Sequence, residues 1–169
     1  YWFNVLQNSD GEFQSDLTFF SEPFSPNPET YLSEFGNNYA GWDFSVPLMN
    51  GRTYKQVLLT YPYYERLKVF GDYEKVSITR AAPDAYLELL AGYKDVFVEP
   101  TTGVIFRIYI NEKLVIEESY NFGDKPINIG KRIQLSEGTH TFRLEVESQD
   151  LSPYDYAAWA VVKLWDRKP

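Results

Sequence analysis

Few side chains in this sequence could carry acid–base or nucleophilic chemistry. The 169-residue chain has one histidine, His140, and no cysteine. The lack of cysteine removes thiolate nucleophiles, disulfides and cysteine-based metal sites. His140 lies on the apolar side of an alternating segment, where an imidazole more often packs in a core than acts as a base. A carboxylate pair can hydrolyse a glycoside, but nothing marks one pair among the 24 acidic residues. We therefore predict that the chain is not an enzyme.

Aromatic residues point instead to binding. The 14 Tyr, 12 Phe and 4 Trp make up 18% of the chain. A sugar ring has apolar C–H faces that stack on aromatic rings, and a polar rim that Asp, Asn or Arg can hydrogen-bond. Aromatics gather in three predicted loops, at 39–42, 61–64 and 154–159. The predicted ligand-binding residues are Trp42, Asp43, Tyr61, Tyr63, Tyr64, Arg66, Tyr154, Asp155 and Tyr156.

Two residues near these loops have competing structural roles. Trp159 lies in the closing apolar segment, so we expect it in the core. Asp155 can also cap the turn that follows Pro153. Asp43 and Asp155, with backbone carbonyls, are the candidates for a structural calcium ion, but the sequence has no Asp-x-Asp-x-Asp run. Because phosphate-binding glycine loops are also absent, we predict no metal site and no cofactor.

The last third of the chain contains the clearest structural elements. Thr139–Ser148 alternates between apolar and polar residues, the pattern of a strand with one solvated face. Such alternation favours antiparallel pairing, because parallel strands buried on both faces would be continuously apolar. Val104–Ile110 and Leu114–Glu118 flank a short polar connection and predict a hairpin. Ala158–Trp165 is a further apolar strand. The apolar side of the alternating segment consists of His140, Phe142, Leu144 and Val146.

Shorter segments supply the other strands. Tyr54–Tyr61, Arg66–Phe70 and Lys75–Arg80 have strand character, and the last two are joined by Gly71-Asp72. Residues 81–84 break the run, and Ala85–Leu90 is interpreted as a strand rather than a helix. Nine to eleven short strands separated by turn signals indicate an all-β, antiparallel, jelly-roll-like β-sandwich. The length of 169 residues favours a single domain over 1–169.

The order of these segments resembles the NPCBM-type carbohydrate-binding modules, a β-sandwich family often appended to glycoside hydrolases. The matching pieces run from about residue 46 to 165, and residues 1–40, with an N-terminal strand and a Pro-rich extension, lie outside them. Where the family has histidines, this chain has Tyr61-Pro62 and Tyr156, and Ala158 replaces an aspartate. The scaffold positions are kept and the polar loop positions are changed. The matching pieces are Pro47-Leu48, Gly51-Arg52-Thr53-Tyr54-Lys55, Gly92-Tyr93, Gly103-Val104-Ile105-Phe106, Phe142-Arg143-Leu144-Glu145-Val146 and Asp155-Tyr156-Ala157-Ala158-Trp159-Ala160.

Charge and hydropathy limit the partners. The formal charge of −8 argues against nucleic acid, which needs a basic surface. No run of about 18 apolar residues is present, so we expect no membrane insertion. The resemblance implies a non-catalytic module that recognises a glycan, and we expect it to be extracellular or on the cell surface.

The N-terminal segment leaves a second function open. Its aromatic and aliphatic residues have strand character and could pair with the chain's own sheet, which is the more common arrangement. They could also complete the sheet of a neighbouring copy. In that alternative the chain is a structural subunit of a surface filament or layer that assembles by strand exchange with other copies of itself. The predicted assembly residues are Tyr1, Trp2, Phe3, Val5 and Leu6.

Overall fold

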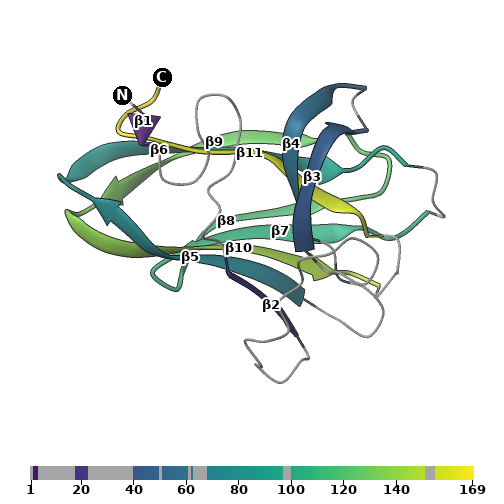
Figure 1. The fold of residues 1–169 in the computed structure, drawn as a ribbon, viewed down its shortest axis with the longest axis horizontal. Coiled ribbons are helices and arrows are strands. Elements are labelled where there is room, and N and C mark those ends of the chain that lie inside the picture. Colours follow the sequence, from purple (N-terminus) through teal and green to yellow (C-terminus); the bar gives the residue numbers. More distant parts are fainter. Residues whose placement is uncertain are drawn as a thin grey trace.

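The computed structural model describes residues 2–3, 18–22, 40–49, 51–60, 62, 68–96, 100–150 and 155–169. These residues form two antiparallel sheets packed face to face, as Figure 1 shows. The prediction of an all-β sandwich is confirmed. The first sheet has the order β3-β4-β11-β6-β9, with β1 paired to β11, and the second has the order β2-β5-β10-β7-β8. The strands of the first sheet are β1 (Trp2–Phe3), β3 (Ala40–Pro47), β4 (Thr53–Thr60), β6 (Ala82–Tyr93), β9 (Ile127–Leu135) and β11 (Ala157–Trp165).

The second sheet is organised around the alternating segment found in the sequence, which is the central strand β10. The apolar side of β10 is buried, and the strand pairs with β5 on one edge and β7 on the other. β7 and β8 form the predicted hairpin, and Asn111 and Glu112 at its turn have φ values of 49° and 67°. Two residues with positive φ suit the twist of a two-residue hairpin loop. The strands of this sheet are β2 (Thr18–Glu22), β5 (Lys68–Ile78), β7 (Val104–Ile110), β8 (Lys113–Tyr120) and β10 (Gly138–Ser148).

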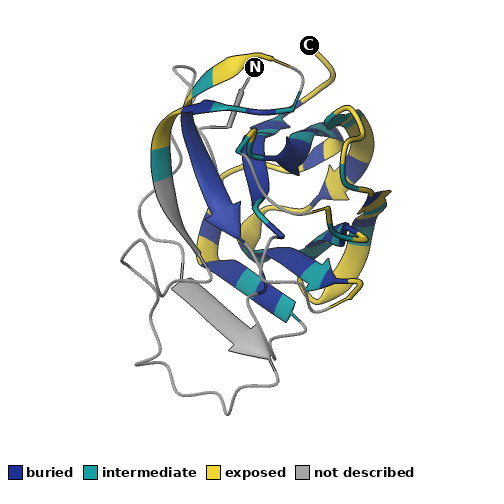
Figure 2. Cartoon of the chain, turned by 90° about the vertical axis from the view of Figure 1, so that its right-hand side faces the viewer, coloured by how far each residue is buried: buried dark blue, intermediate teal, exposed yellow. Residues whose placement is uncertain are grey.

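The inward faces of the two sheets share one apolar core. Trp159 of β11 is fully buried, and its ring meets Phe106 of β7 edge-on at a centroid distance of 5.0 Å. The prediction that Trp159 is a core residue is therefore confirmed. Figure 2 shows the buried strands facing the middle of the molecule. Burying each large side chain of this kind contributes roughly 1.5–3 kcal/mol.

The hairpin of β3 and β4 turns over the outer face of the first sheet. Its strands run across the direction of the others in Figure 1. Leu48, just after β3, forms an isolated β-bridge with Lys94, which follows the end of β6. Because β4 also pairs with β11, the hairpin contacts both β11 and the segment after β6. This path buries a second, smaller apolar cluster, made of Val46, Leu48, Val57, Leu59, Ala158 and Ala160.

Two of the predicted breaks between strands differ in the structure. β5 runs without a break through Gly71 and Asp72, which were expected to separate two strands. Both residues are buried, because β2 and β10 flank them and Arg143 of β10 forms two hydrogen bonds with Asp72. β6 begins at Ala82, inside the predicted break, because a register shift between Ala82 and Ala85 accommodates Pro83.

Candidate functional site

Three strand ends meet at one corner of the first sheet, and they are the ends that the sequence analysis selected. β4 is antiparallel to both of its neighbours, so the start of β3, the end of β4 and the start of β11 lie at the same end. Ala40 is paired with Thr60, and Ala158 is paired with Leu59. We call the described residues 40–44, 58–60, 94 and 156–158 the strand-end corner.

Three of the predicted ligand-binding residues, Trp42, Asp43 and Tyr156, lie in the strand-end corner. The backbone of Trp42 pairs with Leu58 in the strand-end corner. Asp43 and Tyr156 are half-buried there. Five of the predicted residues lie outside the described residues, and they are Tyr61, Tyr63, Tyr64, Arg66 and Tyr154.

Lys94 links two of the predicted residues. Its ammonium Nζ lies 2.6 Å from Oδ2 of Asp43, and both side chains are largely shielded, with 18% and 25% exposure. Its backbone N–H donates to the carbonyl of Tyr156 at 3.0 Å. Lys94 was missed in the sequence because it follows the end of β6, far along the chain from Asp43. A charged pair beside Tyr156 supplies both a donor and an acceptor for a polar ligand.

Phe44 is a second residue that the sequence analysis missed. Its side chain is 63% exposed, an unusual position for a large apolar ring. Its backbone N–H donates to Oδ1 of Asp43, and the next residue, Ser45, has a left-handed φ of 53°. That backbone conformation interrupts the regular pleat between Phe44 and the buried Val46. From period-two alternation alone, Phe44 and Val46 would both be predicted to be buried. No feature of the sequence distinguishes the exposed Phe44 from the buried Val46.

Asp155 has a structural role rather than a ligand-facing one. It is fully buried and accepts hydrogen bonds from three hydroxyls: Tyr93 at 2.7 Å, Thr101 at 2.5 Å and Ser148 at 2.6 Å. Burial raises its pKa above the ordinary value, and the three hydroxyl donors offset part of that rise. Burial also raises the pKa of Tyr93, with the charge of Asp155 as the next contribution. Both carboxylate oxygens are thus engaged inside the fold, so Asp155 is not available to a sugar hydroxyl.

His140 is a packed core residue, as predicted. It is 7% exposed, and each ring nitrogen has a partner. Its Nε2–H donates to the carbonyl of Ser136, and its Nδ1 accepts from the Asn111 side-chain amide, both at 2.9 Å. This arrangement assigns the neutral tautomer with the proton on Nε2 and leaves neither nitrogen directed at a substrate.

The carboxylates considered for calcium have other partners. Asp43 pairs with Lys94, and Asp155 is held by hydroxyls. Among the described residues no group of three or more His, Asp or Glu side chains has the arrangement of a metal site. A calcium site at these two residues therefore gains no support from the geometry.

The described part of the chain also contains no helix long and apolar enough to cross a membrane.

The N-terminal strand pairs within its own chain. Trp2 lies opposite Trp165 and Phe3 opposite Leu164, so β1 extends the edge of β11 that β4 leaves free. This is the arrangement that the sequence analysis regarded as the more common one. The other predicted assembly residues, Tyr1, Val5 and Leu6, lie outside the described residues. Assembly by strand exchange gains no support from this pairing.

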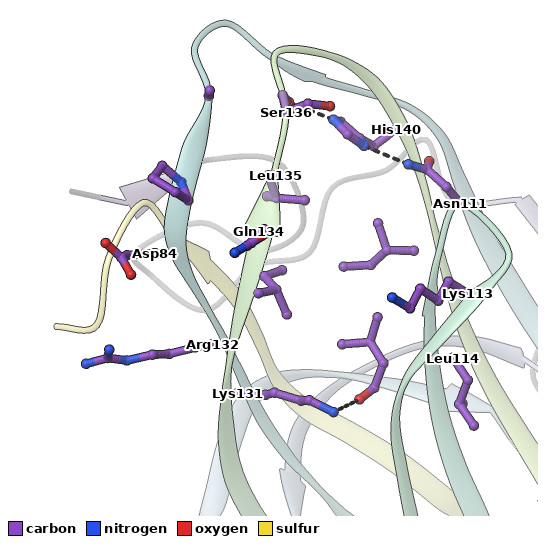
Figure 3. A pocket seen from close by; sticks show the side chains of 15 residues that line it. Asp84, Asn111, Lys113, Leu114, Lys131, Arg132, Gln134, Leu135, Ser136 and His140 are labelled. Carbon is purple, nitrogen blue, oxygen red and sulfur yellow. Dashed lines mark hydrogen bonds between the residues drawn. The ribbon is translucent and has the colours of Figure 1, made fainter.

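A groove lies elsewhere on the described part of the molecule. It lies between β8 and β9, which are the edge strands of the two sheets, and has a volume of about 1150 Å³. Figure 3 shows Lys113 and Lys131 reaching into the space between the strands, with His140 at one end. The predicted ligand-binding residues that the structure describes, Trp42, Asp43, Asp155 and Tyr156, do not line this groove.

Comparisons with known proteins support the architecture. No protein-family model matches the sequence, and no curated protein matches it. Among solved structures, the CBM51 module from Clostridium perfringens GH95, in complex with methyl-galactose, aligns with a TM-score of 0.54 and 14% identity. The alignment covers 81% of this chain and 96% of that one. The chain has the fold of a carbohydrate-binding module.

Two further structures are similar. The tandem CBM51 modules of Sp3GH98, a family 98 glycoside hydrolase from Streptococcus pneumoniae, align at a TM-score of 0.51 and 12% identity, over 97% of this chain and 44% of theirs. CBM51-2 with the INT domains of Clostridium perfringens ZmpB, in complex with GlcNAc, aligns at a TM-score of 0.49 and 18% identity. This alignment covers 70% of this chain, which spans only 24% of that structure. The likeness to NPCBM-type modules remains a resemblance, because no family model matches.

Proposed function

We propose that this chain is a non-catalytic, extracellular or cell-surface module that recognises a glycan at the strand-end corner. The observation that carries the proposal is the register of β3, β4 and β11. It brings together the ends of three strands whose adjoining segments hold most of the predicted binding residues. Antiparallel sandwiches position loops at such ends while the strands hold the loops rigidly apart, which is how many binding sites are built.

The chemistry at the strand-end corner suits a sugar. The exposed ring of Phe44 offers an apolar surface for the C–H face of a pyranose. The pair of Asp43 and Lys94 beside Tyr156 offers an acceptor and a donor for hydroxyls on the ring edge. The fold, shared with CBM51 modules, supports the same interpretation.

A non-catalytic role is consistent with the chemistry of the described residues. The lone imidazole is buried with both nitrogens engaged, and Asp155 is saturated by hydroxyls. The polar atoms of both side chains already have hydrogen-bond partners within the protein, so neither side chain is positioned to act as an acid or base on a glycosidic bond.

A glycan array followed by calorimetry tests this proposal. We expect the intact chain to bind at least one glycan, and Phe44→Ala to weaken that binding about tenfold, because a lost aromatic stack of this size is worth roughly 1 kcal/mol or more. Lys94→Met should weaken binding by removing the donor, and thermal melts should confirm that the variants remain folded. Tyr109→Ala, on the outer face of the other sheet, is the matched control and should leave affinity unchanged. Silence of the whole array, or equal affinities for Phe44→Ala and Tyr109→Ala, would overturn the proposal.

A further inference from the structure

The groove between β8 and β9 is a bounded compartment rather than a gap between sheets. β8 is the edge of one sheet and β9 the edge of the other, so each has only one paired neighbour among the described residues. At one end, Nζ of Lys131 on β9 donates to the carbonyl of Val115 on β8 at 2.6 Å. At the other end, His140 joins the carbonyl of Ser136 to the side chain of Asn111. The two contacts close the groove at both ends, and we call it the edge groove.

The floor of the edge groove is aliphatic. Ile110, Ile133 and Leu135 are core residues that line it, and the first two keep 8% and 9% exposure. Leu114 on β8 is 44% exposed and also lines it. No aromatic residue is among the described lining residues, so flat stacking is not the means by which a ligand would be held. The volume of about 1150 Å³ is slightly above the usual range of roughly 300–1,000 Å³ for small-molecule sites.

The charge inside the edge groove is positive, although the whole chain carries −8. Lys113 and Lys131 extend into the space between the strands, whereas Arg132 and Asp84 lie on the other side of β9, as Figure 3 shows. The described lining as a whole has three cationic side chains, Lys113, Lys131 and Arg132, against one carboxylate, Asp84, so its net charge is positive. A groove lined by positive charge attracts anionic ligands, even though the protein as a whole is acidic.

We propose that the edge groove is a second binding site and that its ligand is a saccharide bearing a carboxylate. The aliphatic floor packs against the C–H face of the ring, and the Lys113 ammonium pairs with the carboxylate. Lys131 adds a second positive charge at the closed end while it keeps its hydrogen bond to Val115. The proposal goes beyond glycan recognition at the strand-end corner, since the two sites share no residue.

An extended peptide added to the edge of β8 fits less well. Strand addition needs the unpaired backbone groups of an edge strand. The carbonyl of Val115 is already occupied by Lys131, and the contacts at both ends leave only the short stretch between Asn111 and Val115. Lysines on edge strands also deter such pairing.

The experiment uses the full chain with isotope-labelled isoleucine methyl groups. Uronate-, sialate- and sulfate-bearing oligosaccharides are titrated by NMR, next to a neutral oligosaccharide of equal length and the simple carboxylate acetate. We expect the carboxylate-bearing saccharides to shift the methyl signals of Ile110 and Ile133, and the neutral sugar and acetate to leave them in place. Raising the salt concentration from 50 to 500 mM should weaken the binding, because partly exposed charge pairs are screened.

Lys113→Gln is the diagnostic variant, and Lys75→Gln, an exposed lysine on β5, is its matched control. Loss of one charge-assisted contact should weaken binding roughly fivefold to tenfold for Lys113→Gln and leave it unchanged for Lys75→Gln. Phe44→Ala should not change binding at the edge groove, so failure here is distinguishable from failure at the strand-end corner. Any of five results would overturn the proposal. Three concern the saccharides: equal binding of the neutral sugar, exclusive binding of sulfated saccharides, or no binding by any carboxylate-bearing saccharide. The other two are equal effects of the two lysine variants, and binding of an acidic peptide in place of every saccharide.

Discussion

The hydroxyl of Tyr93 donates a hydrogen bond of 2.7 Å to the buried carboxylate of Asp155, and 62 residues separate the two in the sequence. Tyr93 ends β6 and Asp155 comes just before β11, so the bond ties two neighbouring strands of the first sheet at the end where the strand-end corner forms. Ser148, at the end of β10, donates to the same carboxylate and brings in the second sheet. One side chain thus joins both layers of the sandwich beneath the proposed glycan site.

Replacing Asp155 with alanine should destabilise the protein strongly. The change leaves the hydroxyls of Tyr93, Thr101 and Ser148 without their acceptor, and buried donors left unsatisfied cost about 1–3 kcal/mol each. We expect the free energy of unfolding to fall by roughly 3 kcal/mol in urea denaturation at pH 7. Asp95→Ala, at an exposed position near the same end, is the control. A loss below about 1 kcal/mol, no larger than that of the control, would contradict the structural role.

The stability contributed by Asp155 should depend on pH in a defined direction. Its folded-state pKa lies above the ordinary value of 3.8, chiefly because burial penalises the charged form. A group with a raised folded pKa stabilises the fold fully below its unfolded pKa, and this contribution is lost as pH rises through the folded value. The free energy of unfolding of the wild-type chain, minus that of Asp155→Asn, should therefore grow as pH falls from 7 toward 4. Urea titrations of both proteins at several pH values measure this difference, and a difference that shrinks on acidification would refute the assignment.

Arg107 should stabilise the folded protein through its ion pairs on the outer face of the second sheet. Its guanidinium contacts Glu117 at 2.6 Å, Glu145 at 3.0 Å and also Glu147. Glu145 is only 5% exposed, so removing Arg107 leaves a nearly buried carboxylate without its main partner. We expect Arg107→Ala to lower the free energy of unfolding by about 2 kcal/mol. Arg107→Lys should recover only part of that loss, because an ammonium cannot form the same fork of hydrogen bonds.

The control for this prediction is Arg132→Ala, an exposed arginine on β9. Chemical denaturation of the three variants should rank alanine at 107 as the least stable and the control as close to wild type. If Arg107→Ala and Arg132→Ala had the same stability, the network would contribute nothing measurable.

Gly103 and Gly138 form a matched pair that separates a steric clash from backbone strain. Both have a positive φ, 123° and 130°, which side chains rarely adopt. A Cβ at Gly103 would lie 2.0 Å from the carbonyl oxygen of Tyr120, whereas a Cβ at Gly138 would meet nothing within 4 Å. Gly138→Ala should therefore cost about 1–3 kcal/mol from strain alone, and Gly103→Ala should cost at least about 2 kcal/mol more. Thermal or urea unfolding of both variants provides the comparison, and equal losses would mean that the backbone near Tyr120 yields without cost.

The sequence by itself determined the class of fold and much of the core. The alternation in 139–148 predicted a strand whose apolar side is buried, and β10 has this arrangement because period-two patterning is a local property of the chain. The hairpin of β7 and β8 was also predicted, from a polar connection at residues 111–113, and the structure shortens that connection to Asn111 and Glu112 because β8 begins at Lys113. The aromatic clusters in the sequence lie next to the three strand ends that form the strand-end corner, but they did not reveal the pairing that brings those strand ends together.

Tertiary structure decided what each polar side chain does. Glu145 lies on the solvated side of an alternating strand, yet Arg107 and Tyr109 of β7 shield it. Asp155 belongs to a loop by sequence, but its carboxylate accepts hydrogen bonds from hydroxyls on three other segments, two of them more than 50 residues away in the chain. The edge groove depends on β8 and β9, which belong to different sheets and are brought together only when the sandwich closes. Patterning reports which face of one element is apolar, whereas burial, partners and concavity arise from contacts between elements, and those contacts form only when the whole chain folds.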